Sequence, residues 1–158
     1  MNLVHYSDKP AKPMRSVGQR QETTCHSKPH GLWVSVEGED DWREWCLSEG
    51  FGLERLTHVH DVTLADDENV LRLGGPAGID AFTREFGERS YGSMGIRWHD
   101  VAARWQGIII APYVWARRLD GDAGWYYGWD CASGCIWDAR AIASVTLREI
   151  VTLPERVA

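Results

Sequence analysis

The stretch from Lys28 to Cys46 reads KPHGLWVSVEGEDDWREWC and constrains the fold more than any other part of the sequence. Its apolar run from Gly31 to Val36 predicts a β-strand, and the acidic residues that follow predict a turn. Asp40 or Asp41 can then cap a helix, and Gly50 predicts where that helix ends. A strand, a turn and a helix in so short a span predict a compact unit of mixed secondary structure.

This predicted strand has two different faces. Alternate side chains point to opposite faces, so Leu32, Val34 and Val36 form one apolar face suited to a core. Trp33 and Ser35 share the other face. Two interpretations of that face are open: it is the wall of a pocket, or it is a sheet surface that Trp33 covers and on which Ser35 is solvated.

The composition is that of a globular protein, with 44% hydrophobic and 25% charged residues among 158. The net charge of −6 disfavours non-specific binding to duplex nucleic acid. Nine tryptophans are unusual, because indoles fill cores but also stack on nucleobases and planar cofactors. No run is apolar enough to cross a membrane, and the first ten residues lack a signal-peptide pattern. We therefore expect one cytoplasmic domain, residues 1–158, without a membrane partner.

The four cysteines allow two interpretations. Cys131 and Cys135 are separated by three residues and would form half of a zinc site. The other candidate ligands are Cys25, His26, His30 and Cys46. A second close ligand pair is missing, and four cysteines in a chain of this length do not resemble a disulfide framework. We therefore expect reduced, mostly buried thiols with no metal and no disulfide, and a zinc-stabilised protein remains the alternative.

Short strand and helix patterns alternate along the rest of the chain. Strand patterns cover residues 2–6, 56–64, 69–73, 108–110, 125–129, 134–137 and 143–153. Helix patterns cover residues 79–86 and 98–105, and loops are predicted at 7–28, 88–95 and 117–124. The run Ile108–Ile110 is apolar on both faces, which predicts a central strand. These patterns predict an α+β fold with six or seven strands and two or three helices.

Four segments, taken in order, resemble the ADP-ribosyltransferase domain. They are LVHYS at 3–7, GLWVS at 31–35, VAARWQGIII at 101–110 and GCIWDARAI at 134–142. The resemblance spans most of the chain and depends on the order of motifs that are each short. It implies a split mixed or antiparallel sheet and an NAD-dependent transferase similar to small bacterial toxins or phage-encoded modifiers, which is an analogy of fold.

The resemblance implies an NAD site between the first two strands. His5 matches the family's first-strand histidine, which contacts the ribose, and a neutral imidazole can donate at one nitrogen and accept at the other. Ser35 matches the hydroxyl beside the nicotinamide, with Trp33 next to it. The implied NAD contacts are His5, Tyr6, Ser7, Gly31, Trp33, Ser35 and Ser133. A partly buried histidine and a core tryptophan are the other interpretations of His5 and Trp33.

One expected catalytic residue departs from the family pattern. The family carries a carboxylate, usually Glu, on a late strand, where it stabilises the positive charge that develops on the ribose. This sequence has Ser133 or Gly134 at that position, and the nearest preceding acid is Asp130. Either Asp130 replaces the glutamate, with His5 and Ser35 as the other catalytic residues, or Asp130 is a turn residue in a catalytically altered domain. Asp138 is better explained as a turn or cap residue.

The expected function is therefore NAD-dependent transfer of ADP-ribose to a protein or nucleic-acid acceptor, or hydrolysis of NAD. The alternative is a non-catalytic binding module that holds a protein or a single-stranded nucleic-acid base on an aromatic platform. That platform requires the strands on either side of the 117–124 loop to form a hairpin. Its residues would be Tyr113, Trp115, Trp125, Tyr126, Tyr127 and Trp129.

Overall fold

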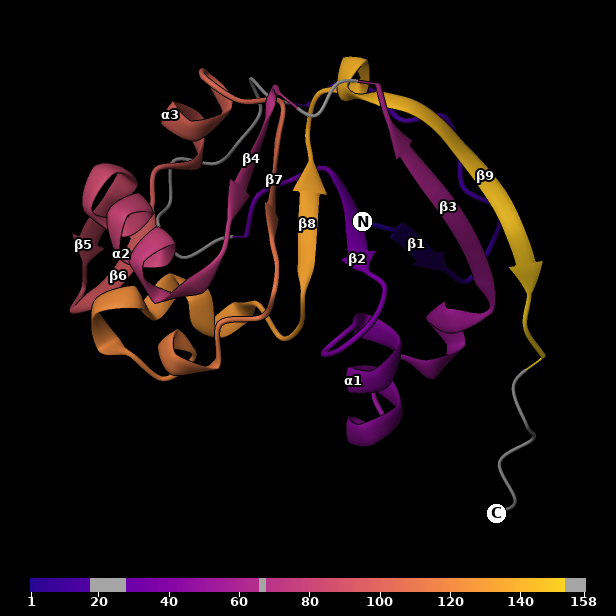
Figure 1. The fold of residues 1–158 in the computed structure, drawn as a ribbon, viewed down its shortest axis with the longest axis horizontal. Helices are drawn as coiled ribbons and strands as arrows, with labels where there is room; N and C mark the ends of the chain where they lie inside the picture. Colours follow the sequence, from indigo (N-terminus) through magenta and orange to yellow (C-terminus); the bar gives the residue numbers. More distant parts are fainter. Residues whose placement is uncertain (18–27, 66–67, 153–158) are drawn as a thin grey trace.

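The computed structural model describes residues 1–17, 28–65 and 68–152. These residues form a seven-stranded sheet, a separate two-stranded hairpin, three α-helices and several short 3-10 helices. The expected mixed α+β fold is confirmed at this level (Figure 1).

The large sheet has the strand order β4-β7-β8-β2-β1-β3-β9. Its strands are β1 (Leu3–Ser7), β2 (Leu32–Val36), β3 (His58–Leu64), β4 (Val70–Leu73), β7 (Gly107–Ile110), β8 (Ser133–Ile136) and β9 (Ile142–Ile150). Strands β4 and β7 are parallel, and all other neighbours are antiparallel. The first strand in the sequence therefore lies inside the sheet, between β2 and β3.

The helices form where local signals predict them. Helix α1 (Trp42–Glu49) begins at Asp41, whose carboxylate accepts a hydrogen bond of 2.8 Å from the Glu44 amide. It ends at Gly50, which has a φ of 63° and so adopts the left-handed conformation that favours glycine. Helix α2 (Gly75–Phe86) and the shorter α3 (Trp98–Ala102) follow. Figure 1 shows α2, α3 and the hairpin on the β4 side of the molecule, and α1 below the end of β2.

The buried strand β7 separates two apolar clusters. Ile108 and Ile110 belong to the cluster that contains the aromatic side chains of α2 and α3. Ile109 belongs to a second cluster with Val34 and Ile136. The alternation follows from strand geometry, since neighbouring side chains point to opposite faces. The prediction that residues 108–110 are buried on both faces is confirmed.

Two predicted elements are wrong. The predicted loop at 88–95 is a hairpin of β5 (Gly87–Ser90) and β6 (Ser93–Ile96), whose turn contains Tyr91 and Gly92 with positive φ. The predicted strand at 125–129 lies instead largely in a 3-10 helix, Gly121–Gly128. Aromatic residues are common in strands, but here they come from a short helical segment, from which Trp125 and Tyr126 pack against the core while Tyr127 is exposed.

The observed boundaries of some elements differ from the predicted ones. The strand predicted at 56–64 begins at His58, because a 3-10 helix (Leu53–Leu56) precedes it. The helix predicted at 98–105 ends at Ala102, and the last strand spans Ile142–Ile150.

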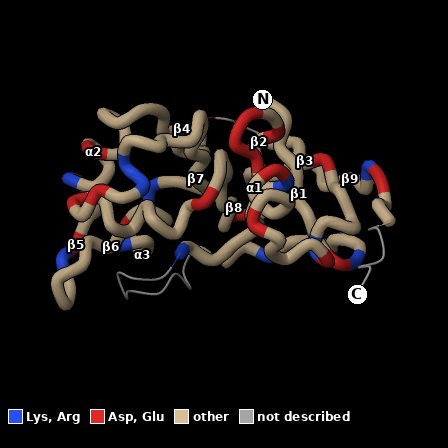
Figure 2. The backbone as a smooth tube through the Cα atoms, turned by 90° about the horizontal axis from the view of Figure 1, so that it is seen from below, with Lys and Arg blue, Asp and Glu red and all other residues tan. Residues whose placement is uncertain are grey.

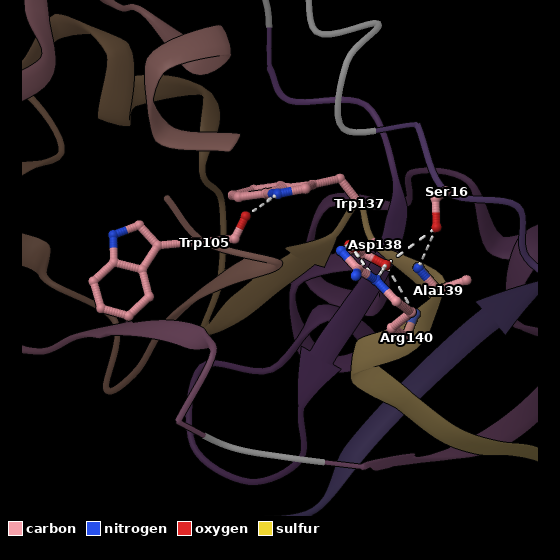
Figure 3. A network of polar contacts seen from close by, with 6 residues as sticks. All are labelled: Ser16, Trp105, Trp137, Asp138, Ala139 and Arg140. Atoms are coloured by element: carbon pink, nitrogen blue, oxygen red, sulfur yellow. Dashed lines mark hydrogen bonds and ion pairs between the residues drawn. The ribbon is translucent and has the colours of Figure 1, made fainter. Parts of the chain in front are cut away.

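The segment before residue 18 is held against the end of β8. The Val17 amide donates to the Trp137 oxygen at 2.7 Å. Ser16 Oγ donates to Asp138 at 3.2 Å and accepts from the Ala139 amide at 2.9 Å (Figure 3). Asp138 also caps the next 3-10 turn by accepting from the Arg140 amide, as a cap residue should. The Arg140 side chain holds the pKa of this carboxyl down to about 2.

Candidate functional site

Strands β1 and β2 pair over a short distance. Their register contains two residue pairs, Leu3 with Val36 and Val4 with Ser35, whereas β1 pairs with β3 along all five of its residues. Beyond Val4 the ladder between β1 and β2 ends. At this point the side chain of His5 bridges the two strands in place of a backbone pair.

His5 joins the two strands where their backbones no longer pair. Its Nδ1 lies 2.8 Å from the main-chain oxygen of Trp33. Because a carbonyl oxygen can only accept, Nδ1 carries the hydrogen and Nε2 is left as an acceptor. Burial lowers the pKa of His5, with a smaller contribution in the same direction from His60. The imidazole is therefore neutral near pH 7 and presents one acceptor nitrogen.

A second histidine supports this arrangement from β3. His60 is buried, and its ring centre lies 5.9 Å from that of His5. Its Nε2 accepts a hydrogen bond of 3.0 Å from the Ala11 amide. His60 thereby ties the chain after β1 to the sheet beside His5.

A cavity of about 300 Å³ lies beside the point where β1 and β2 separate. Three distant parts of the sequence form its wall, namely β1, β2 and the segment that enters β8. The lining residues from these parts are Val4, His5, Tyr6, Trp33, Val34, Ser35, Trp129, Asp130, Cys131 and Ser133. Lys28, Trp42 and Arg55 complete the lining. The volume is at the lower end of the range for small-molecule sites.

Aromatic rings form one wall of the cavity. The rings of Trp33 and Trp129 lie 4.9 Å apart at an angle of 57°. The Lys28 ammonium lies 5.3 Å from the centre of the Trp33 ring. Burial raises the pKa of Tyr6 to about 12, so this phenol keeps its proton. The cavity thus offers flat apolar surfaces with a cation beside them, which suits a planar ring carrying polar substituents.

Asp130 supplies a carboxylate to this cavity without any bulge in β8. It lies between the 3-10 helix and Ser133, the first residue of β8, and its side chain is 22% exposed. Two cations are close to it: Arg118 at 3.5 Å and Lys28 at 3.9 Å. The carboxylate therefore has positive charge on two sides and borders the cavity on another.

The two serines of the site lie opposite each other on β2 and β8. Ser35 Oγ accepts a hydrogen bond of 2.9 Å from the Trp42 amide, which fixes the start of α1 beside the cavity. Ser133 Oγ donates to the Cys131 oxygen at 3.0 Å. Ser35 therefore has a structural role as an acceptor, while its own hydrogen is available to a ligand.

Two residues expected to contact NAD do not line the cavity. Ser7 Oγ donates to the Lys9 oxygen at 2.7 Å. Gly31 packs against β8, where a Cβ atom would come within 2.3 Å of the Ile136 oxygen. The absence of a side chain at Gly31 is thus explained by strand packing rather than by a ligand.

No protein-family model, curated protein or solved structure matches the chain.

The described cysteines are buried and free. Burial raises the pKa of Cys46 to about 11 and that of Cys131 to about 12, and it raises the pKa of Cys135 further. These thiols stay protonated at neutral pH and are poor nucleophiles. Among residues 1–17, 28–65 and 68–152, no three His, Cys, Asp or Glu side chains gather as metal ligands. Cys25 and His26, part of the alternative zinc set, lie outside the described residues.

No helix in the described part of the chain is long and apolar enough to cross a membrane.

The prediction that the aromatic platform lies on a hairpin is wrong. Two 3-10 helices, Trp115–Arg117 and Gly121–Gly128, stand where its strands would be. Its buried members are Tyr113, Tyr126 and Trp129. The rings of Trp115 and Tyr127 are each 59% exposed, and the Arg118 guanidinium lies 5.8 and 5.7 Å from their centres. The aromatic residues are therefore divided between core and surface.

Sequence reasoning did not place seven of the lining residues in the site, namely Val4, Lys28, Val34, Trp42, Arg55, Trp129 and Cys131. Lys28 lies in a predicted loop just before β2. Arg55 lies just before the strand predicted at 56–64, in a 3-10 helix that the sequence did not indicate. Trp42 was assigned to α1 without a place in the site. A basic residue close to a strand that carries a tryptophan is a weak signal, because solvated arginines and lysines are far more common than ligand contacts.

Proposed function

We propose that the chain binds NAD in the 300 Å³ cavity and either transfers ADP-ribose to an acceptor or hydrolyses NAD. One observation carries this proposal. Residues from three separate segments of the chain, represented by His5, Ser35 and Asp130, line the same cavity where β1 and β2 separate. Segments so far apart in sequence supply an aromatic wall, a neutral histidine and a carboxylate, which together suit a nicotinamide ribose.

Each group has a role in this proposal. The nicotinamide ring packs on the wall of Trp33 and Trp129, and His5 Nε2 accepts a hydrogen bond from a ribose hydroxyl. Lys28 and Arg55, whose side chains are 48% and 65% exposed, attract the phosphates on the solvent side. The cavity holds the nicotinamide end of the dinucleotide, because 300 Å³ is small for the whole molecule.

The proposed reaction breaks the bond between the nicotinamide nitrogen and the ribose carbon. Nicotinamide leaves as a neutral molecule with the electron pair of that bond, and positive charge develops on the ribose. The ionised Asp130 stabilises this charge. Water or an acceptor side chain then supplies the new electron pair to the ribose carbon and releases a proton to Asp130 or to solvent.

The charge around Asp130 favours a protein acceptor over a nucleic acid. Asp130 also lines a second cavity of about 370 Å³, so one carboxylate borders two spaces. The other acidic residues of this second cavity are Asp40, Asp41, Glu44 and Glu49. Figure 2 shows acidic residues gathered at α1 and the turn before it. A cationic side chain is attracted to such a surface, whereas a phosphate backbone is repelled.

The test is incubation of the purified protein with NAD, followed by chromatographic measurement of free nicotinamide. We expect release above the rate without protein, and a further increase when a cationic protein mixture is added. Absence of release with water and with every acceptor would contradict the transferase proposal. A rise in melting temperature with NAD, without release, would indicate binding alone.

A binding module is the second candidate, and the exposed pair Trp115 and Tyr127 favours it. Two exposed rings with Arg118 beside them can hold an unstacked base. Titration with a single-stranded oligonucleotide, followed by tryptophan fluorescence, would reveal such binding. Trp115→Ala should abolish it and leave NAD binding intact, because Trp115 does not line the smaller cavity.

A further inference from the structure

Trp129 has an indole nitrogen that the folded chain leaves unpaired. In residues 1–17, 28–65 and 68–152, its Nε1 is the one buried side-chain nitrogen or oxygen without a hydrogen-bond partner. The side chain is 1% exposed and lines the 300 Å³ cavity. An indole N–H can only donate, and a buried donor without an acceptor destabilises the protein. Such a group in a native structure calls for an explanation.

Comparable indoles in this protein are paired. Trp137 Nε1 donates to the Trp105 oxygen at 2.6 Å (Figure 3), and Trp125 Nε1 donates to Thr83 Oγ1 at 2.8 Å. None of the residues in these two bonds lines the cavity. The unpaired donor therefore belongs to an indole that lines the cavity.

We infer that Trp129 Nε1 donates a hydrogen bond to the carboxamide oxygen of bound nicotinamide. This inference rests on the proposed function and makes Trp129 a specificity-determining residue of the same site. The indole that carries the donor is part of the aromatic wall, with its ring centre 4.9 Å from that of Trp33, where the nicotinamide ring packs. Phosphate oxygens belong instead near Lys28 and Arg55, which are far more exposed than Trp129.

The neighbouring charge also selects the amide over the acid. Asp130 follows Trp129 directly and lines the same cavity. A ligand carboxylate at the same position would lose its hydration, would be repelled by Asp130 and would compete with Asp130 for Lys28 and Arg118. A neutral carboxamide oxygen accepts the indole hydrogen at a smaller desolvation cost, which favours the amide over the acid.

The test compares Trp129→Phe with Trp125→Phe, a matched loss of one indole N–H outside the cavity. Calorimetric titration with NAD and with ADP-ribose, which lacks nicotinamide, gives the dissociation constants. We expect Trp129→Phe to bind NAD roughly tenfold more weakly and ADP-ribose as the wild type does. Trp125→Phe should leave both constants unchanged. In the free protein, Trp125→Phe should lower the melting temperature, whereas Trp129→Phe should keep or raise it, because it removes an unpaired donor.

Several outcomes would overturn the inference. Wild-type affinity of Trp129→Phe for NAD would exclude the hydrogen bond, and equal weakening towards NAD and ADP-ribose would place the acceptor elsewhere on the ligand. Unfolding of Trp129→Phe but not of Trp125→Phe would show a structural role.

An independent check on the wild type is nuclear magnetic resonance of its indole N–H groups. Nicotinamide should shift one solvent-protected signal, and no shift would contradict the inference. Wild-type protein that binds neither NAD nor ADP-ribose would instead overturn the proposed function itself.

Discussion

His5 on β1 and Trp33 on β2 are joined by a hydrogen bond of 2.8 Å from a side chain to the main chain, just where the backbone ladder between their strands ends. The imidazole replaces a missing backbone pair on one side and offers a free acceptor nitrogen on the other. The same residue thus supports the sheet and equips the cavity. Substitutions can separate these two roles.

His5→Asn should keep the structural role and lose the ligand role. The Asn amide can donate in place of Nδ1, but no atom of Asn replaces Nε2. We expect the free energy of unfolding to fall by less than about 1 kcal/mol, with NAD affinity reduced roughly tenfold. His5→Ala should lose both, at a stability cost of about 1–3 kcal/mol. Urea unfolding and calorimetric titration measure the two effects, and wild-type NAD affinity in His5→Asn would exclude His5 from the ligand site.

Asp130→Asn should stop the reaction while the fold persists. The substitution preserves shape and removes the charge that faces the ribose, so nicotinamide release should fall by on the order of a hundredfold or more. Melting temperature should change little, because partly exposed ion pairs contribute little to stability. Asp122→Asn is the matched control, since Asp122 pairs with Arg89 outside the cavity. Full activity in Asp130→Asn would make Asp130 a turn residue and refute the catalytic assignment.

The pKa of His5 predicts how stability depends on pH. Burial lowers this pKa in the folded protein below the ordinary value of 6.5, so the unfolded chain binds more protons as the pH falls below that value. The contribution of His5 is therefore complete above about pH 6.5 and decreases between that value and the lowered pKa. Urea unfolding of wild type and His5→Asn from pH 5 to 8 should show a steeper loss in the wild type. Parallel curves would contradict a lowered pKa at His5.

Ser16→Ala should destabilise the protein by about 1 kcal/mol. Ser16 Oγ both donates to Asp138 and accepts from the Ala139 amide, so its loss leaves the Ala139 amide without its partner, whereas Asp138 keeps its hydrogen bonds from Arg140 (Figure 3). Ser144→Ala, on the exposed side of β9, removes a hydroxyl with no comparable role and should change the unfolding free energy by less than about 0.5 kcal/mol. Thermal unfolding of the two variants provides the comparison. Equal melting temperatures would show that the Ser16 contacts are not maintained in solution.

Local signals explain why part of the fold could be predicted from the sequence. The cap at Asp41, the left-handed Gly50 and the alternation around Val34 are encoded within a few residues, and all three appear in the structure as expected. The hairpin formed by β5 and β6 was missed because its sequence, GERSYGSMGI, is polar and poor in β-branched residues. Its turn at Tyr91–Gly92 is held by backbone conformation rather than by hydrophobic periodicity.

Part of the candidate site could likewise be predicted from the sequence, and part could not. The resemblance predicts that His5, Trp33 and Ser35 share one site, with Asp130 as one candidate for its carboxylate, and all four residues line one cavity in the structure. Lys28 and Arg55 join them through long-range packing that no local pattern records. The unpaired N–H of Trp129 could not be predicted from the sequence, because it depends on the absence of a hydrogen-bond acceptor among the buried groups around it.

The central position of β1 has a consequence for synthesis on the ribosome. The first strand in this sequence must wait for β2 and β3 before it has neighbours, and the cavity lacks a wall until residues 129–133 have been made. Chains are made from the N-terminus at several residues a second, so His5 exists for seconds before Asp130 does. A nascent or prematurely terminated chain therefore carries the histidine without the carboxylate, and the proposed chemistry begins only after translation has passed β8.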